Sequence, residues 1–474
     1  MDTRRLLSIT AIFGFADVIV LAVGGFLLLP LYTRTLSQSE FGTYVIFRTN
    51  TEILTYLLFL GLPSAVSRVY FDHKKQGTHI EYLSSIATFF LLNLLVVTTM
   101  LSIWGPDFWA LLSPATPVGP LLAFSLAIAA VGFFAALGTL WLRMEGRAGM
   151  FAALQIATSA VLAAMAVFNL VVLEAGLPGL LSAMLVSSAC SAMALPWIFG
   201  RRFRMRIRWT HLTDSLPYAM PILIGYVAYF VLNRIGTLIL QRHVASEQIA
   251  IFGLAQQLAM VVAIAAMAFG KASQPAVFAA EPGQAPELMQ RSGRVFILVM
   301  LCVTSVLVLF SSEIFALVAP NSYAGGHEVL LVLLVANFAY SFTQVSDTAL
   351  LYHRKPKSSV AVSLAGAGIA AALGSVLVPR YHLEGAAVAT LGAFLATALL
   401  GHWRAQRSTG HSYHAILLPS LATIVLLALL AGWLGRRALP LPMTLAVKTA
   451  GCALIFMSVR KLATRNRLAI PCNP

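Results

Sequence analysis

Three side chains able to bind a ligand lie inside a stretch that is apolar enough to cross a membrane. Residues 41–61, FGTYVIFRTNTEILTYLLFLG, contain Arg48, Asn50 and Glu52. A charge at the centre of a membrane helix costs about 2.5 to 3.5 kcal/mol on insertion scales, so such residues usually face a wet cavity or a partner. Arg48 and Glu52 are four residues apart and share one helical face, whereas Asn50 points elsewhere. The pair indicates either a binding site or a local salt bridge that stabilises packing.

A second polar pair lies in the later stretch YFVLNRIGTLIL, which contains Asn233 and Arg234. By helix position, Arg234 lies in the outer part of the bilayer, at a depth similar to that of Arg48. An arginine fork binds phosphate oxygens bidentately, and more strongly where water is scarce. We therefore predict that Arg48 and Arg234 bind an anionic group, with Glu52, Asn50 and Asn233 as further substrate-binding residues. The alternative for Arg234 is a side chain that snorkels to the outer headgroups.

Three other polar residues fall within apolar stretches. Asp17 is a lone carboxylate in the first apolar run, and such a group can carry a proton or bind a cation, so it is a candidate for ion coupling. A cavity-wall or packing role is the alternative for Asp17. Gln256 either lines the same cavity or joins two helices. Lys448 is expected to snorkel at the lipid edge.

The composition identifies a membrane protein. Of the 474 residues, 59% are hydrophobic and 10% are charged, whereas soluble domains carry about 25% charged residues. The net charge of +15 does not predict nucleic-acid binding, because that needs a basic face on a folded soluble module. Here the basic residues lie in short loops between apolar runs. Nucleic acid is therefore not an expected partner.

The hydropathy pattern predicts an all-α membrane protein with 14 transmembrane helices. Each apolar run is long enough to cross a hydrocarbon core about 30 Å thick. The predicted spans are 10–32, 42–62, 82–104, 119–141, 151–172, 178–199, 216–239, 249–270, 293–311, 328–351, 359–378, 384–403, 414–434 and 441–459.

The basic residues indicate which loops face the cytoplasm. With the N-terminus placed inside, 24 Lys and Arg fall on the inner side and five fall in outer loops. This asymmetry follows the positive-inside rule. It predicts a multi-pass membrane protein with both termini in the cytoplasm.

Weak internal similarity indicates a repeat of six helices. RTLSQSEFGTYVIF from residue 34 resembles RHVASEQIAIFGLA from residue 242, and two further matches follow at nearly the same offset. Because six is even, both repeats enter the membrane from the same side, and parallel repeats place a substrate site at their interface. The predicted domains are a six-helix bundle over 1–200, a basic cytoplasmic linker over 201–212, a second bundle over 213–405, and accessory helices 13 and 14 with a cytoplasmic tail over 406–474.

No motif of a soluble enzyme is present. The sequence lacks the Walker pattern GxxxxGK[ST], GxSxG and HExxH, which mark nucleotide, acyl-transfer and zinc-protease sites. The four cysteines have no metal-type spacing. We therefore expect no enzymatic activity, no cofactor and no metal.

The ordered motifs LYTRTLSQSEFGTYVIF and LGLPSAVSRVYFDHKKQG resemble the polysaccharide flippase family (O-antigen and exopolysaccharide type) of the multidrug/oligosaccharidyl-lipid/polysaccharide flippase superfamily. The resemblance covers nearly the whole chain. It implies two six-helix bundles forming a V that alternates its opening and turns over an undecaprenyl-pyrophosphate-linked oligosaccharide, with a cationic lumen for the pyrophosphate. Relatives often have an acidic residue where this chain has Asn233, so ion coupling through that position is not expected here.

Other functions remain open from the sequence. A cation-coupled exporter of the multidrug and toxin extrusion type would use Asp17 as its coupling carboxylate, but its lumen is usually acidic. A lipid II flippase also has fourteen spans and a cationic lumen. A membrane scaffold is the alternative of a different class. The flippase reading implies membrane lipids, a polysaccharide polymerase and other assembly proteins as partners.

Overall fold

A computed structural model describes residues 3–112, 118–193, 195, 207–280, 284–323, 325–409, 414–436, 447–453 and 456–457. Within these ranges the chain is all-α, with no β-strand. Eleven helices are long and apolar enough to cross a membrane. One of them, Pro356–Arg407, contains two helices joined across a kink at His382, and a shorter apolar helix covers Gly176–Ala192. With the two halves of Pro356–Arg407 counted apart and the shorter helix included, the described residues contain thirteen apolar helices. The predicted span 441–459 lies mostly outside the described residues.

The chain divides into two compact units, which are described separately. Unit 1 comprises Met1–Phe230 and Gln241–Ala250, and unit 2 comprises Val231–Leu240 and Ile251–Pro474. The predicted domain boundaries, which place a linker at 201–212 and an accessory region after 405, stay a prediction. Half of that linker, residues 201–206, lies outside the described residues.

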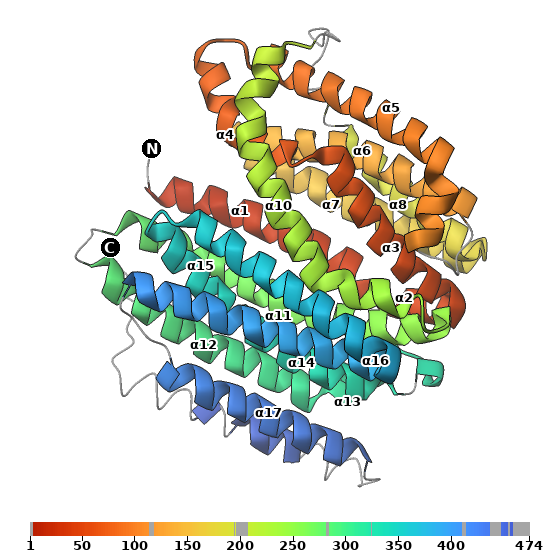
Figure 1. Ribbon diagram of the computed structural model, residues 1–474, viewed down its shortest axis with the longest axis vertical. Helices are drawn as coiled ribbons and strands as arrows, with labels where there is room; N and C mark the ends of the chain where they lie inside the picture. Colours follow the sequence, from red (N-terminus) through yellow and green to blue (C-terminus); the bar gives the residue numbers. More distant parts are fainter. Residues whose placement is uncertain are drawn as a thin grey trace. The chain divides into compact units, whose positions relative to one another are not determined.

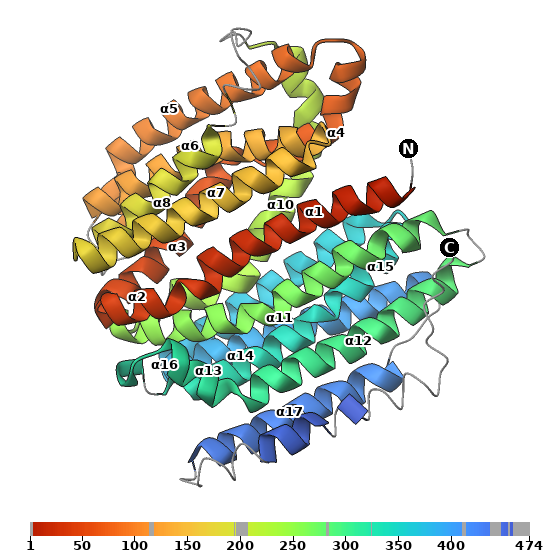
Figure 2. The same ribbon diagram turned by 180° about the vertical axis from the view of Figure 1, so that it is seen from behind.

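Unit 1 is a bundle of membrane helices. Within it α6 packs against α8 and α3, and α7 packs against α8 and α1; these helices run alongside one another in both views (Figures 1 and 2). Its elements are α1 (Thr3–Ala22), the π-helix η1 (Val23–Leu27), α2 (Leu29–Thr35), α3 (Gln38–Phe59), α4 (Leu62–Lys75), α5 (His79–Leu112), α6 (Val118–Met144), α7 (Ala148–Val167), the π-helix η2 (Phe168–Val172), α8 (Gly176–Ala192), the first part of α10 (Trp209–Leu240) and the start of α11 (Ser246–Ala279).

Unit 2 is a second bundle. In it α14 packs against α16 and α12, and α12 packs against α17, as the green-to-blue helices of Figure 1 show. Its elements are the end of α10, most of α11 (Ser246–Ala279), α12 (Ala285–Leu309), α13 (Ser311–Val318), the 3-10 helix η4 (Asn321–Tyr323), α14 (Gly326–Ser341), α15 (Thr343–Tyr352), α16 (Pro356–Thr409) and α17 (His414–Arg436).

Helix starts recur along the chain at nearly constant spacing. Gln38 of α3 and Ser246 of α11 lie 208 positions apart, and the starts of α6 and α14, at Val118 and Gly326, lie 208 apart as well. This spacing matches the offset of the sequence similarity and supports a six-helix repeat. How the repeats are arranged stays a prediction.

The start of α3 is fixed by a capping box. The Glu40 backbone N–H donates to the Ser37 hydroxyl at 3.2 Å, and the Glu40 carboxylate accepts from the Ser37 backbone N–H at 2.9 Å. Both bonds satisfy donors that the first helical turn leaves without intrahelical partners. The other carboxylate oxygen of Glu40 accepts from the Leu177 N–H of α8 at 3.2 Å. One residue therefore caps α3 and holds α8 beside it.

A break between α3 and α4 redirects the chain. Leu60 and Gly61 both have left-handed backbone conformations, with φ of 49° and 71°, and Pro63 lies in the first turn of α4. A Cβ on Gly61 would lie 2.5 Å from the carbonyl oxygen of Ala219 in α10. Glycine is thus required for its conformation and for the close approach of α10.

Candidate functional site

Arg48 is held within unit 1 by aromatic and acidic side chains. It is partly buried in α3, and its guanidinium carbon lies 5.9 Å from the centre of the Tyr44 ring, one turn earlier. Tyr32 and Glu52 are its other electrostatic neighbours, and the Tyr32 and Tyr44 rings meet edge to face at 5.8 Å. A cation in a membrane helix is stabilised by such partners.

Glu52 continues the same face of α3. The Tyr56 hydroxyl donates to Glu52 Oε1 at 3.0 Å, and the Glu52 carboxylate attracts the guanidinium of Arg48. The two charges therefore belong to a row of polar side chains at four-residue spacing, and the predicted common face of Arg48 and Glu52 is present. The four-residue spacing that places Tyr44 before Arg48 and Tyr56 after Glu52 is the signal in the sequence for this row.

Asn50 lies elsewhere on α3, as its helical position predicts. Only 1% of its surface is exposed, so the side chain is enclosed by unit 1. Its role in substrate binding stays a prediction that this burial does not favour.

Asn233 and Arg234 lie at the end of α10, in unit 2. Arg234 Nη1 donates to Gln256 Oε1 at 3.2 Å, and Gln256 Nε2 donates to the Asn233 carbonyl oxygen at 2.7 Å. Gln256 therefore joins α11 to α10 and directs the guanidinium of Arg234 along α11. This contact argues against snorkelling of Arg234 to the outer headgroups.

The 208-residue offset relates the contact between Arg234 and Gln256 to the position of Arg48 in the first half. The starts of α3 and α11 lie 208 positions apart, so under the predicted repeat Gln256 corresponds to Arg48. Arg234 places its guanidinium against that glutamine. If the predicted repeat is correct, the Arg234 guanidinium lies beside the position that corresponds to Arg48, although the helix before α11 supplies it.

Asp17 is not the lone carboxylate that the sequence indicated. Its Oδ1 lies 2.9 Å from Nη2 of Arg143, at the end of α6. The Arg143 guanidinium also lies over the rings of Phe13 and Phe151, at 5.7 and 4.8 Å. Sequence patterns missed this ion pair because its partners are 126 residues apart. The role of Asp17 in ion coupling stays a prediction, and its isolation is no longer an argument for it.

Lys448 does not snorkel at the lipid edge. It is 2% exposed, and its ammonium donates to both carboxylate oxygens of Glu313 at 2.7 and 2.8 Å and to the Ser312 hydroxyl at 2.8 Å. Burial raises the pKa of Glu313, but the hydrogen bonds from Lys448 and Ser312 outweigh burial and hold that pKa below its usual value. The ion pair fastens the helical segment around Lys448 to α13 of unit 2.

An apolar groove of about 490 Å³ lies between α14, α16 and α17 of unit 2. Its walls include Leu331, Val335, Leu391, Leu429 and Trp433. A groove of this composition suits a hydrocarbon chain.

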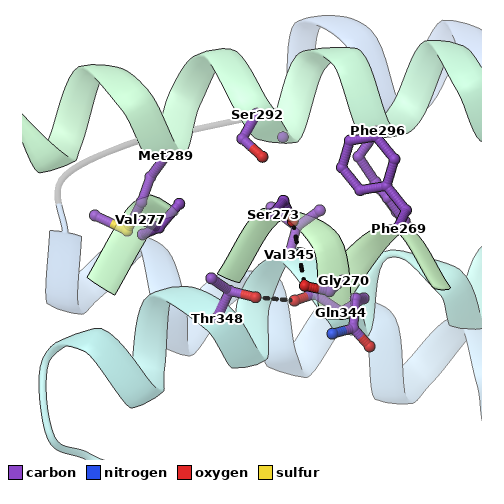
Figure 3. A pocket seen from close by; sticks show the side chains of 11 residues that line it. Phe269, Gly270, Ser273, Val277, Met289, Ser292, Phe296, Gln344, Val345 and Thr348 are labelled. Carbon is purple, nitrogen blue, oxygen red and sulfur yellow. Dashed lines mark hydrogen bonds between the residues drawn. The ribbon is translucent and has the colours of Figure 1, made fainter. Parts of the chain in front are cut away.

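A much smaller pocket lies in unit 2 between α11, α12 and α15 (Figure 3). Its volume is about 20 Å³, and Ser273, Ser292 and Thr348 line it. This space suits one ordered water molecule. It begins at Phe269, thirteen positions along α11 from Gln256, so it is separate from the contact of Arg234.

In the part of the chain that the structure describes, no group of three or more His, Cys, Asp or Glu side chains is placed to hold a metal ion. Cys190, Cys302 and Cys452 are free.

The fold matches transporters of known structure. The lipid II flippase MurJ in an inward closed conformation aligns with a TM-score of 0.74 at 11% identity, over 98% of this chain and 99% of that one. An outward-facing transporter of the multidrug resistance MATE family aligns with a TM-score of 0.59 at 15% identity, over 85% and 95%. A superfamily transporter from Pyrococcus furiosus aligns with a TM-score of 0.57 at 16% identity, also over 85% and 95%. At these identities the matches establish the fold alone, which this chain shares with these transporters.

No curated protein matches the chain in sequence. The family model described as polysaccharide biosynthesis protein matches residues 14–280, which is more than half of the chain. With the helices and the fold already described, this match makes the protein a multi-pass membrane member of the polysaccharide biosynthesis protein family.

Proposed function

We propose that this protein flips a polyprenyl-pyrophosphate-linked oligosaccharide from the cytoplasmic to the outer leaflet of the bacterial inner membrane by alternating access. The observation that carries the proposal is Arg48, a guanidinium held inside an apolar helix by Tyr44, Tyr32 and Glu52. Such a group binds phosphate oxygens strongly where water is scarce. Arg234, on Gln256, is its counterpart in the second half.

The family and the fold support a lipid-linked substrate. The family model is described by polysaccharide biosynthesis, and one solved relative of this fold is named as a lipid II flippase. The groove between α14, α16 and α17 offers an apolar surface for a hydrocarbon chain. The candidate residues include two arginines as well as the two acids Glu52 and Asp17, so their summed charge is balanced rather than acidic. A cationic drug would favour an acidic set, and it is therefore a poorer fit than an anionic headgroup.

The test replaces the two arginines and measures surface polysaccharide in cells together with the amount of protein in the membrane. Arg48→Ala and Arg234→Ala are each expected to reduce surface polysaccharide at an unchanged protein level. Arg147→Ala is the matched control, because Arg147 is an exposed arginine between α6 and α7. Normal polysaccharide in the double variant would remove both residues as headgroup ligands.

Deletion of the gene distinguishes an oligosaccharide flippase from a peptidoglycan precursor flippase and from a multidrug exporter. Mass spectrometry of extracted lipids should show a polyprenyl-pyrophosphate oligosaccharide accumulating in the deletion strain. Accumulation of lipid II alone would instead indicate a peptidoglycan precursor flippase. Unchanged lipids together with increased sensitivity to cationic drugs would indicate an exporter of the multidrug type.

A further inference from the structure

Unit 1 carries a row of polar and aromatic side chains along α3 and α4. On α3 the row contains Arg48, Glu52 and Tyr56 at four-residue steps, and on α4 it continues with Ser64 and Arg68 at the same spacing. From Arg48 to Tyr56 the helix rises about 12 Å. Charged and polar side chains have a high free-energy cost in contact with lipid tails, so a row of them marks a surface that lipid does not cover.

The break between the two helices keeps the row facing one partner. The left-handed conformations of Leu60 and Gly61 separate α3 from α4, and the missing side chain of Gly61 lets the Ala219 carbonyl oxygen of α10 approach. Tyr56 at the end of α3 and Ser64 and Arg68 of α4 therefore all contact α10. A single straight helix would rotate the later residues away from it, because the four-residue step drifts by about 40° per repeat.

Two tyrosines of α10 complete the row. The Tyr226 ring stacks on Tyr56 with centres 5.9 Å apart and planes 22° apart, and the Tyr226 and Ser64 hydroxyls share a hydrogen bond of 2.7 Å. The Arg68 guanidinium carbon lies 5.9 Å from the centre of the Tyr218 ring. Tyr226 is 41% exposed and Tyr218 is 46% exposed, so each ring is anchored on one side and accessible on another.

This combination of groups has the chemistry of a carbohydrate site. A pyranose ring has an apolar face of C–H groups, which stacks on an aromatic ring, and a rim of hydroxyls, which bond to carboxylates, guanidinium groups and other hydroxyls. Tyr56 and Tyr226 offer the rings, and Glu52, Ser64 and Arg68 offer the polar partners. A hydrocarbon chain lying on this row would remove water from these polar groups and offer them no hydrogen bond in return, at a cost.

We propose that this row is an oligosaccharide track, on which the sugars of the substrate stack against Tyr226 and Tyr56 while the pyrophosphate is bound at Arg48. The proposal rests on the proposed function and extends it by assigning the sugar-binding residues. It predicts that Tyr226 and Tyr56 discriminate between lipid pyrophosphates with and without sugars.

The test measures dissociation constants for the full-length protein in lipid nanodiscs with two probes. One probe is undecaprenyl pyrophosphate, and the other is the sugar-bearing undecaprenyl pyrophosphate extracted from cells that lack the gene. For Tyr226→Leu we expect the dissociation constant of the sugar-bearing probe to rise about two- to tenfold, the range that aromatic stacking gives, and that of the sugarless probe to stay within error.

Two variants guard against a general loss of structure. Tyr226→Phe keeps the stacked ring and loses only the hydroxyl contact with Ser64, so it should retain most of the preference for sugar. Tyr381→Leu removes a tyrosine of α16 that is 59% exposed and lies outside the row, so it should change neither constant. Should Tyr226→Leu fail to fold, the Tyr56→Leu variant is measured in the same way.

The outcomes separate this proposal from the proposed function. If the wild type binds both probes through Arg48 and the tyrosine variants weaken both equally, or neither, the track is wrong and the flippase function stands. If the wild type binds neither probe, the proposed function and the track both fail.

Discussion

The close approach of α3 and α11 at their starts leads to a quantitative prediction. A Cβ on Gly42 would lie 1.8 Å from the carbonyl oxygen of Ser246 and 2.6 Å from its carbonyl carbon. Real Cβ contacts are essentially never shorter than 3.0 Å, so Gly42→Ala requires a displacement of at least about 1.2 Å. The obstacle is backbone, which cannot turn aside as a flexible side chain does.

The displacement has two costs. Overpacking of a well-packed site costs about 1 to 3 kcal/mol. Retreat of α11 also breaks the hydrogen bond from Gln38 Nε2 to the Glu247 carbonyl oxygen, now 3.1 Å, which contributes about 1 kcal/mol. We therefore expect Gly42→Ala to lower the free energy of unfolding by about 2 to 4 kcal/mol.

The assay is SDS-induced unfolding of the purified protein in mixed micelles, with Gly132→Ala as the control. Gly132 lies within α6, and a Cβ there meets nothing within 4 Å. Alanine is favoured over glycine inside a helix by about 0.5 to 1 kcal/mol, so the control should be slightly more stable than the wild type. Equal stability of the two variants would refute the close approach of α3 to Ser246.

Three further predictions concern ion pairs. Glu145 accepts hydrogen bonds from Lys74 and the Tyr70 hydroxyl, and these bonds outweigh burial and lower its pKa below 4.5. A carboxyl whose pKa is lower in the folded than in the unfolded state stabilises the folded state at pH values above the unfolded pKa. The difference in unfolding free energy between wild type and Glu145→Gln should therefore be constant from pH 8 to pH 6 and should shrink as the pH falls below about 4.5. Lys448→Met should cost about 1 to 3 kcal/mol, because it leaves the Glu313 carboxylate without its cation, and adding Glu313→Leu should recover part of that loss in the same unfolding assay. Asp17→Asn should cost less than about 1 kcal/mol, because its ion pair with Arg143 is only partly buried, and an unchanged pH and sodium profile of transport in vesicles would rule out Asp17 as the coupling site.

The sequence by itself determined the class of fold. Twenty-residue apolar runs must satisfy their backbone hydrogen bonds internally in lipid, so they form helices whatever their neighbours are. The 54 residues of Pro356–Thr409 are far more than the roughly 20 that cross a membrane once. Hydropathy therefore predicts two spans there, and the structure divides them at His382. The common face of Arg48 and Glu52 follows from helical spacing alone, and the structure confirms it.

Only the tertiary structure decided which polar groups meet. Asp17 pairs with Arg143 across 126 positions, and Lys448 pairs with Glu313 across 135; neither contact follows from spacing within one helix. The stacking of Tyr226 on Tyr56 likewise joins two helices far apart in the chain.

The physical reason lies in the apolar surface of membrane helices. A soluble helix shows its buried side by an apolar stripe, but a helix that is apolar all round carries no such mark of its rotation about its axis. Which side faces another helix is set by close packing and by small residues such as Gly42 and Gly61. The sequence therefore specifies that charges such as Arg48 need partners, and the packing of the helices specifies which partners they have.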